Sequence, residues 1–273
     1  QVSQNSLPDR QSKKENIMSK YEFILFDVED QVATLTLNRP DALNALTIEM
    51  MAEVRLAMAE IEADSNIRAL IFTSAGRGFC SGQDLKNRPA PGTDIVELYC
   101  DVYLGVFKDI QACRVPVIMA VNGIAAGGGF SLALNGDIIM AARSAKFIQV
   151  FSRIGLIPDL GSTWLLPRAI GRTRALKIMM TNETLMAETA LEWGMITDCV
   201  DDDQLIPHAR ELALRLAKGP TRTLVATRAT VDEGNDNDFA AQFRRELEVN
   251  GVMRETFDGI DGVNAFLEKR PSA

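Results

Sequence analysis

The pattern of apolar and polar positions predicts several short strands in the first two thirds of the chain. Two runs rich in β-forming residues, YEFILFDV and QVATLTLN, flank Glu29 and Asp30 and therefore indicate a hairpin. The continuous apolar runs IRALIFTSA and PVIMAVNG are typical of strands that are buried on both faces. DIIMAA and KFIQV indicate two further short strands.

Helical spacing of apolar residues predicts the other elements. A helix should start near Thr47, because Met51, Val54, Met58 and Ile61 follow at helical spacing. The segment DIVELYCDVYLGVFKDIQA is also helix-rich, and after about residue 160 helices dominate, as in ALKIMMTN, AETALEWG, LIPHARELALRLAKG and FAAQFRRELEVNGVMRET. Strands that alternate with helices predict an α/β fold, here with a helical C-terminal third.

Composition and charge exclude several classes of protein. The chain has 273 residues, 47% of them hydrophobic, which is enough for a sizeable core, either in one large domain or in one domain with an appendage. A net charge of −8 disfavours nucleic acid and anionic membranes as partners, although local basic groups could still hold a small anionic ligand. No apolar run is long enough to cross a bilayer. We expect a cytoplasmic protein.

The N-terminal residues 1–17 are polar and contain no apolar core, so they are not expected to be a signal peptide. We expect a disordered tail or an added stretch, with the folded chain beginning at Met18. The four cysteines show no C-x-x-C spacing and the chain has one histidine, so neither a metal site nor a disulfide framework is expected.

Two of the predicted strands end in turns of glycine, alanine and serine, in ALIFTSAGRGFCSGQDL and PVIMAVNGIAAGGGFSL. The second turn leads into the predicted helix FSLALNGD, whose free N–H groups should lie beside Gly127, Gly128 and Gly129. Two facing turns with inward N–H groups would form an oxyanion hole. Tight packing of strand against helix, with no ligand, is the alternative interpretation.

Other glycine-associated motifs are not supported. The glycines do not spell G-x-G-x-x-G after either strand, and no G-K-[ST] follows them. GFSLA partly resembles a nucleophile elbow around Ser131. The only available base, His208, occupies a polar position on an amphipathic helix, so a serine triad is not favoured.

Asp159 is the only carboxylate in the run VFSRIGLIPDLGSTWLLPRAIG. It could cap the helix predicted in STWLLPRA, although Ser162 stands closer to that helix. It could instead be an acid/base group, because the apolar neighbours Phe151, Ile157 and Leu160 would raise its pKa.

The motifs LNRPDALNAL, GRGFCSGQDL, RVPVIMAVNGIAAGGGFSLAL, GDIIMAARSAKF, GLIPDLGSTWLLPRAIG and AETALEWGMITDCV occur in this order over about residues 20 to 200. In their order and joint spacing they resemble the crotonase superfamily of enoyl-CoA hydratases and isomerases. The resemblance implies a spiral of ββα units over residues 18–200. It also implies a helical region over residues 201–273 that builds homotrimers, often paired into hexamers.

The resemblance further implies that the substrate is an acyl-CoA, with coenzyme A as part of the substrate and no permanently bound cofactor. The thioester oxygen would lie between the N–H groups of Ser81 and Gly128, which favours the oxyanion hole. Phe79 and the loop 86–93 should border the acyl pocket. The implied substrate and CoA contacts are Ala42, Leu43, Ala45, Gly82, Gln83, Asp84, Leu85 and Gly127, with Phe266 and Lys269 at the nucleotide end, from the same or a neighbouring subunit.

Hydratases of this superfamily use two glutamates, and the matching positions here hold Ser131 and Phe151, neither of which transfers protons at neutral pH. Asp159 is the remaining acid/base candidate. The run SRIGLIPDLGSTWLLPR most resembles phenylacetate-pathway isomerases that act on ring epoxides. We therefore predict an acyl-CoA isomerase with Asp159 as its acid/base residue. The alternatives are other enolate chemistry (hydration, dehalogenation, ring opening or ring formation) and a CoA-binding protein without turnover, which would have no use for Asp159.

Overall fold

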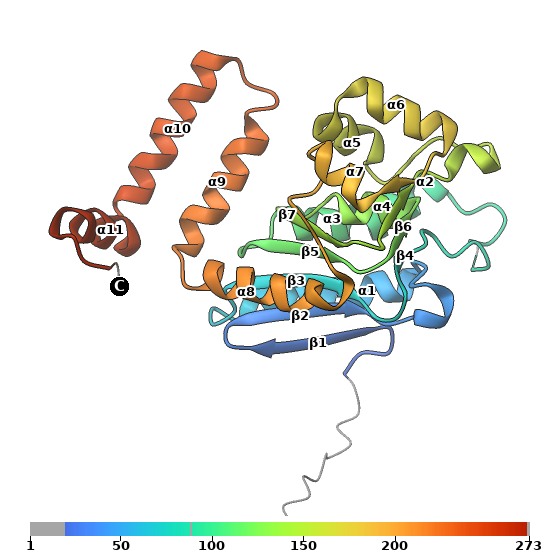
Figure 1. Cartoon of the computed structure of the whole chain (residues 1–273), viewed down its shortest axis with the longest axis horizontal. Helices are drawn as coiled ribbons and strands as arrows, with labels where there is room; N and C mark the ends of the chain where they lie inside the picture. The colour runs from blue at the N-terminus through green and yellow to red at the C-terminus, as the bar shows by residue number, and fades with distance from the viewer. Residues whose placement is uncertain (1–19, 88, 272–273) are drawn as a thin grey trace, which may run out of the picture.

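A computed structural model describes residues 20–87 and 89–271. The extension predicted for residues 1–17 lies outside the described residues. Two sheets and the helices that cover them form the main body, and three C-terminal helices extend from it (Figure 1).

The larger sheet has six strands in the order β1-β2-β3-β5-β7-β10. β1 and β2 are antiparallel, and the remaining pairs are parallel. Every residue of β3 and β5 is buried, as their continuous apolar runs predict for parallel strands covered on both faces. The strands are β1 (Ile24–Glu29), β2 (Val32–Leu37), β3 (Ala69–Ser74), β5 (Val117–Val121), β7 (Ile138–Ala142) and β10 (Asp198–Val200).

The smaller sheet has the strand order β4-β6-β8-β9, formed by β4 (Gly78–Cys80), β6 (Ile124–Ala126), β8 (Lys146–Ile148) and β9 (Leu185–Met186). β3, β5 and β7 of the larger sheet are followed along the chain by β4, β6 and β8, respectively, and each such pair is followed by helix. The chain therefore winds as repeated strand–strand–helix units. In this arrangement the turns after β4 and β6 become neighbours, because these two strands are paired in parallel.

The predicted hairpin and the predicted helix at Thr47 are confirmed. Asp30 and Gln31 form the two-residue hairpin turn with φ values of +49° and +67°, as the favoured hairpin turn requires. The Thr47 side chain accepts a hydrogen bond from the Met50 N–H and caps the following helix.

The helices are α1 (Ile48–Ala63), α2 (Ile95–Tyr99), α3 (Gly105–Gln111), α4 (Gly128–Ala133), α5 (Ser162–Ile170), α6 (Arg172–Thr181), α7 (Ala187–Glu192), α8 (Leu205–Ala217), α9 (Thr221–Glu233), α10 (Phe239–Arg254) and α11 (Phe257–Glu268). A π-helical turn (Cys100–Leu104) joins α2 to α3. Short 3₁₀ turns occur at η1 (Pro40–Ala42), η3 (Phe151–Ile154) and η4 (Asp202–Gln204).

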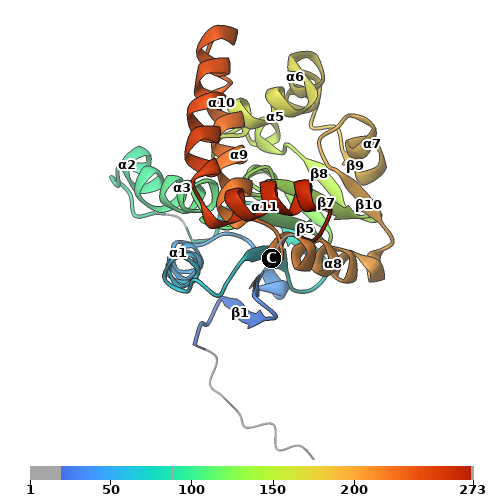
Figure 2. The ribbon, with the colours of Figure 1, turned by 90° about the vertical axis from the view of Figure 1, so that its left-hand side faces the viewer.

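The helical region predicted from residue 201 consists of two parts. Helix α8 packs against the larger sheet through Ala209, Ala213 and Ala217. Helices α9, α10 and α11, which we call the arm, stand apart from that sheet in Figure 1, and in Figure 2 the arm faces the viewer. The arm is tied to the body where Arg228 pairs with Asp137 at 2.9 Å.

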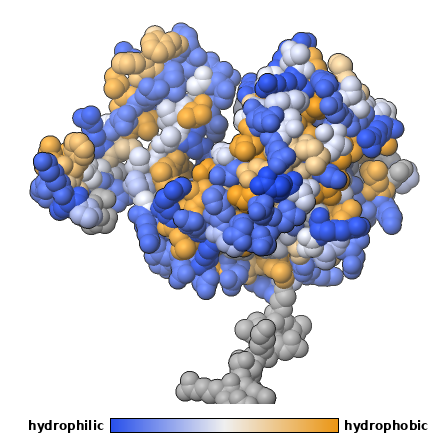
Figure 3. All heavy atoms as spheres, in the orientation of Figure 1, coloured by the Kyte–Doolittle hydropathy of each residue, from blue (hydrophilic) through white to orange (hydrophobic). Residues whose placement is uncertain are grey.

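The arm exposes large apolar side chains, some of which are visible as orange atoms on its surface in Figure 3. Phe239, Phe266 and Leu267 are 86%, 83% and 72% exposed. Exposed apolar patches of this kind mark surfaces that pack against another molecule. Within the described part of the chain, no helix is both long enough and apolar enough to cross a membrane.

Candidate active site

The site lies where the turn after β4 meets the turn between β6 and α4. Leu46 forms a parallel bridge with Gln83, in which the Leu46 N–H donates to the Gly82 carbonyl and the Asp84 N–H donates to the Leu46 carbonyl. In such a bridge the N–H of Gln83 itself points away from Leu46. A Cβ atom built on Gly128 would lie 3.8 Å from the Gln83 nitrogen, so this N–H is beside the start of α4.

Ser81 was expected to supply one oxyanion donor, and the structure contradicts this. The Ser81 N–H already donates to the Leu43 carbonyl at 3.0 Å, so it is not free to bind a thioester oxygen. The N–H groups of Gln83 and Gly128 have no hydrogen-bond partner among residues 20–87 and 89–271. The pair of neighbouring free donors is therefore Gln83 and Gly128.

Two glycines allow these turns to approach each other. Gly82 has a φ of +94°, and a Cβ atom on it would lie 2.9 Å from the Ala126 carbonyl oxygen. A Cβ atom on Gly128 would lie 2.8 Å from Leu160 Cδ1. A side chain at either position would push the two turns apart or fill the space in front of the free N–H groups.

The segment predicted to line the CoA path lies against the turn after β4. The carbonyls of Ala42 and Leu43 accept hydrogen bonds from the hydroxyl and the N–H of Ser81, respectively. The structure thus brings residues 42–46 together with residues 81–84. Asp84 pairs with Arg39 at 3.0 Å, and this pairing holds the pKa of Asp84 below its usual value.

A cavity of about 1030 Å³, which we call the main cavity, adjoins this pair of donors. Such a volume is sufficient for a large acyl group. Its lining is mostly apolar, and among the described residues that line it the titratable groups are Tyr99, Cys100 and Asp159. The other lining residues are Gln83, Leu85, Pro89, Ile95, Val96, Leu104, Phe107, Gln111, Asn135, Ile154, Leu156, Leu160, Gly161, Trp164 and Leu165.

The Asp159 carboxyl group lacks the partners that a structural aspartate normally has. Its Oδ1 atom is buried and has no hydrogen-bond partner in the described chain. Burial raises the pKa of Asp159, and its own backbone N–H provides a smaller opposing effect. Burial and the nearby Asp159 carboxylate also raise the pKa of Tyr99.

Asp159 does not cap the following helix. Gly161 is the N-cap residue of α5, and no side chain caps that end. The backbone carbonyl of Asp159 is the group that is held, because it accepts from the Ser162 N–H at 3.0 Å and from the Ser131 hydroxyl at 3.1 Å. The backbone around Asp159 is therefore fixed while the Oδ1 atom of its carboxylate is left without a partner among the described residues.

The surroundings of Asp159 differ in part from those predicted. Ile157 is 80% exposed and does not enclose the carboxylate. Phe79, which was expected to border the acyl pocket, is fully buried in the core beside Phe72. Leu160 does line the main cavity, and its φ of +50° is unusual for a leucine.

Phe266 and Lys269, in α11 and at its C-cap, are exposed on the arm, and no described residue of α9, α10 or α11 lines the main cavity. Within one chain the structure does not bring these two residues to the site. His208 lies in α8 with its Nε2 atom 3.1 Å from Asp198, and the Ser131 hydroxyl donates to the Asp159 carbonyl, so these two residues are not hydrogen-bonded to each other as a triad would need.

The comparisons with known proteins show the family and agree with the fold. The model of the enoyl-CoA hydratase/isomerase family matches residues 27–273. The chain belongs to this family. It is therefore similar to enzymes that act on acyl-CoA thioesters, and its two sheets and strand–strand–helix units are the crotonase-like fold predicted from the sequence.

Its relatives include both isomerases and hydratases. The chain is 45% identical to 1,2-epoxyphenylacetyl-CoA isomerase from Escherichia coli K12, over 91% of this chain and 97% of that protein. It is 33% identical to (E)-benzylidenesuccinyl-CoA hydratase from Thauera aromatica, over 92% and 98% of the two chains. A crystal structure of enoyl-CoA hydratase from Bacillus anthracis superposes with a TM-score of 0.87 at 30% identity, covering 92% of this chain and 98% of that one.

Proposed function

We propose that the protein is an acyl-CoA isomerase in which Asp159 is the acid/base residue, with coenzyme A present only as part of the substrate. The observation that supports this most directly is the unpaired, buried oxygen of Asp159, the only carboxylate among the described residues that line the main cavity. A burial-raised pKa suits a group that must both take up and return a proton.

The free N–H groups of Gln83 and Gly128 would hold the thioester carbonyl oxygen and stabilise the enolate that forms when the neighbouring carbon loses a proton. In a 3-enoyl-CoA, Asp159 takes a proton from C2, and the negative charge spreads over the thioester and the double bond. The same carboxyl group then returns the proton to C4, which leaves the double bond between C2 and C3. One proton is removed and one is added, so no second reactant is needed.

Hydration is less well supported, because it needs a further group to activate water. The positions that match the two hydratase glutamates hold Ser131 and Phe151. The Ser131 hydroxyl is already directed at the Asp159 carbonyl, and Phe151 is buried. Ser131 thus contributes to positioning the loop of Asp159 instead of transferring protons.

We expect the protein to hydrate crotonyl-CoA far more slowly than a typical enzyme turns over, which is on the order of 10 per second. The physical reason is the lack of a second carboxylate among the described residues that line the main cavity opposite Asp159. The measurement is the loss of enoyl-thioester absorbance with time. Turnover in the typical range would show that Ser131 and Phe151 do not prevent hydration.

A ring-epoxide substrate is the second candidate within this function. The side-chain nitrogen of Gln83, which lines the main cavity, is buried without a partner among the described residues. A buried donor without a partner costs about 1–3 kcal/mol, and an oxygen atom on the acyl group would provide the missing hydrogen-bond acceptor. The E. coli relative is named for an epoxidised acyl group of this kind.

The experiment that tests the function is a screen of acyl-CoAs by mass spectrometry and ultraviolet absorbance, including cis-3-enoyl-CoA and ring-epoxide phenylacetyl-CoA. An isomer of unchanged mass and altered absorbance is the expected product. Binding of every thioester without conversion of any would instead support a CoA-binding protein without turnover.

We also propose that the arm assembles the protein into trimers or hexamers. Its exposed apolar residues, among them Phe239, Phe257 and Phe266, would be covered by neighbouring copies. In that arrangement Phe266 and Lys269 would contact the nucleotide end of CoA bound to a neighbour.

We expect native mass spectrometry at micromolar concentration to give masses of three or six chains. Replacing Phe239 and Phe243 together with serine should shift the distribution towards monomers, since both side chains are exposed on α10. A wild-type protein that stays monomeric at these concentrations would rule out this role of the arm.

A further inference from the structure

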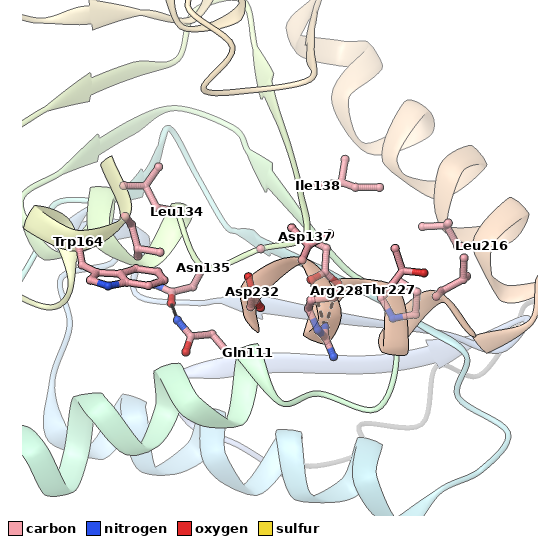
Figure 4. A pocket seen from close by; sticks show the side chains of 15 residues that line it. Gln111, Leu134, Asn135, Asp137, Ile138, Trp164, Leu216, Thr227, Arg228 and Asp232 are labelled. Carbon is pink, nitrogen blue, oxygen red and sulfur yellow. Dashed lines mark hydrogen bonds and ion pairs between the residues drawn. The ribbon is translucent and has the colours of Figure 1, made fainter. Parts of the chain in front are cut away.

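The main cavity shares one wall with a second cavity. Gln111, Asn135, Trp164 and Leu165 line both of them. The second cavity, which we call the arm cavity, measures about 520 Å³ and lies between the body and α9. In Figure 4, Gln111, Asn135 and Trp164 lie at one end of the arm cavity, and Arg228, Thr227 and Leu216 lie at the other.

A hydrogen bond joins two of the residues that form this shared wall. Gln111 Nε2 donates to Asn135 Oδ1 at 2.8 Å (Figure 4). Asn135 is 6% exposed, and its Nδ2 atom donates to the Ser131 carbonyl at 2.7 Å. Both ends of the Asn135 side chain are therefore engaged, while Gln111 is an exposed residue whose side chain is held in the wall by its hydrogen bond to Asn135.

The wall is connected to the acid/base residue through a series of hydrogen bonds. Ser131 joins it to the loop of Asp159, because the Ser131 hydroxyl donates to the Asp159 carbonyl. Asp159 lines the main cavity together with Gln111 and Asn135. When the reacting carbons of an acyl group lie at Asp159, the rest of that group therefore shares a cavity with this wall.

The arm cavity is suited to an apolar chain. Most of its side-chain lining is apolar, and of its three charged residues Asp137 and Arg228 are paired with each other at 2.9 Å. The third, Asp232, has its pKa raised by burial, and the charge of Arg228 opposes this effect. The apolar lining residues outside the shared wall include Leu134, Ile138, Leu216, Leu224 and Val231.

We propose that Gln111, held by Asn135, is the floor of the acyl site and sets the length of acyl group that the protein accepts, and that the arm cavity behind it is a subsite for the far end of a longer alkyl chain. This inference rests on the proposed binding of acyl-CoA. Gln111 acts as a specificity-determining residue and takes no part in proton transfer.

The test uses saturated acyl-CoAs of increasing chain length, with affinity measured by calorimetry on the full-length protein. Saturated chains are not isomerised, so the measurement is independent of turnover. In the wild type, affinity should rise with chain length and then stop rising once the chain reaches the floor. In Gln111→Ala it should continue to rise by about 4-fold for each further methylene, the factor for burying one such group.

Two further variants separate size from hydrogen bonding and locate the added space. Gln111→Met keeps the bulk and loses the hydrogen bond that holds the side chain in the wall, so the length limit should relax, but by less than in Gln111→Ala. Adding Thr227→Trp to Gln111→Ala should restore the limit, because Thr227 lines the arm cavity and does not line the main one. The variant Thr227→Trp alone should bind all chains as the wild type does.

If Gln111→Ala has the same chain-length limit as the wild type, Gln111 is not the floor, and the isomerase proposal stays intact. If the double variant with Thr227→Trp still binds longer chains more tightly, the arm cavity is not the subsite. A protein that binds these chains with the predicted limits but isomerises no enoyl-CoA would overturn the proposed isomerase and leave the floor standing. Failure to bind any acyl-CoA would overturn both.

Discussion

Replacing Asp159 with asparagine is expected to reduce isomerase turnover by about 10²–10⁴-fold, the usual contribution of a general acid/base residue. The change keeps the size of the side chain and removes its ability to accept a proton. The fold should survive, because the hydrogen bonds that hold this loop go to the Asp159 backbone carbonyl. The measurements are turnover on one 3-enoyl-CoA, affinity for a saturated acyl-CoA and the melting temperature.

The direction in which the Asp159→Asn substitution changes stability follows from the pKa of Asp159. Burial raises the pKa of Asp159 in the folded state. The stability linked to this group is therefore fully present below the pKa of the unfolded chain, and it is lost as pH rises through the folded pKa. At pH 7 the asparagine variant should melt at the same temperature as the wild type or higher. Unchanged turnover together with a lower melting temperature would show that Asp159 is structural.

The wild-type pH profile gives an independent measurement. Turnover requires an ionised Asp159, so kcat should fall on acidification at a pH above the usual range of aspartate, and the asparagine variant should lose that limb.

Elements with a clear local pattern could be predicted from the sequence. The hairpin and the helix after Thr47 depend on turn and cap chemistry within a few residues, although the turn is formed by Asp30 and Gln31, one residue later than predicted. The buried strands β3 and β5 have continuous apolar runs. The strand β10 was not predicted, because three residues give no periodicity and its pairing with β7 is set by the tertiary fold.

The sequence predicts which segments form the site more reliably than it predicts which way their backbone N–H groups and side chains point. The two glycine turns were predicted to face each other, and the family resemblance added Asp159 to the same site. Whether Ser81 or Gln83 presents a free N–H depends on the positive φ of Gly82 and on the bridge to Leu46, a residue far away in the chain. The exposure of Ile157 and the burial of Phe79 likewise follow from packing between distant segments.

The assignment of the oxyanion-hole donor to Gln83 instead of Ser81 can be tested by removing single backbone N–H groups. Replacing Gln83 with its α-hydroxy acid turns its amide N–H into an ester oxygen and keeps the side chain. Turnover should fall by about 10²–10³-fold, the usual cost of removing one oxyanion-hole donor. The Gly82 carbonyl becomes a weaker acceptor for the Leu46 N–H, so a small loss of stability is also expected.

The matched control is the same replacement at Ser81, which removes the donor to the Leu43 carbonyl. That change should lower the free energy of unfolding by about 1–3 kcal/mol, because a hydrogen bond is lost and its acceptor is left unpaired. Turnover per folded molecule should stay close to that of the wild type. A large loss of turnover from the Ser81 ester together with an active Gln83 ester would reverse the assignment. The expected pattern follows from geometry, since the Ser81 N–H is already bonded and the Gln83 N–H is free beside Gly128.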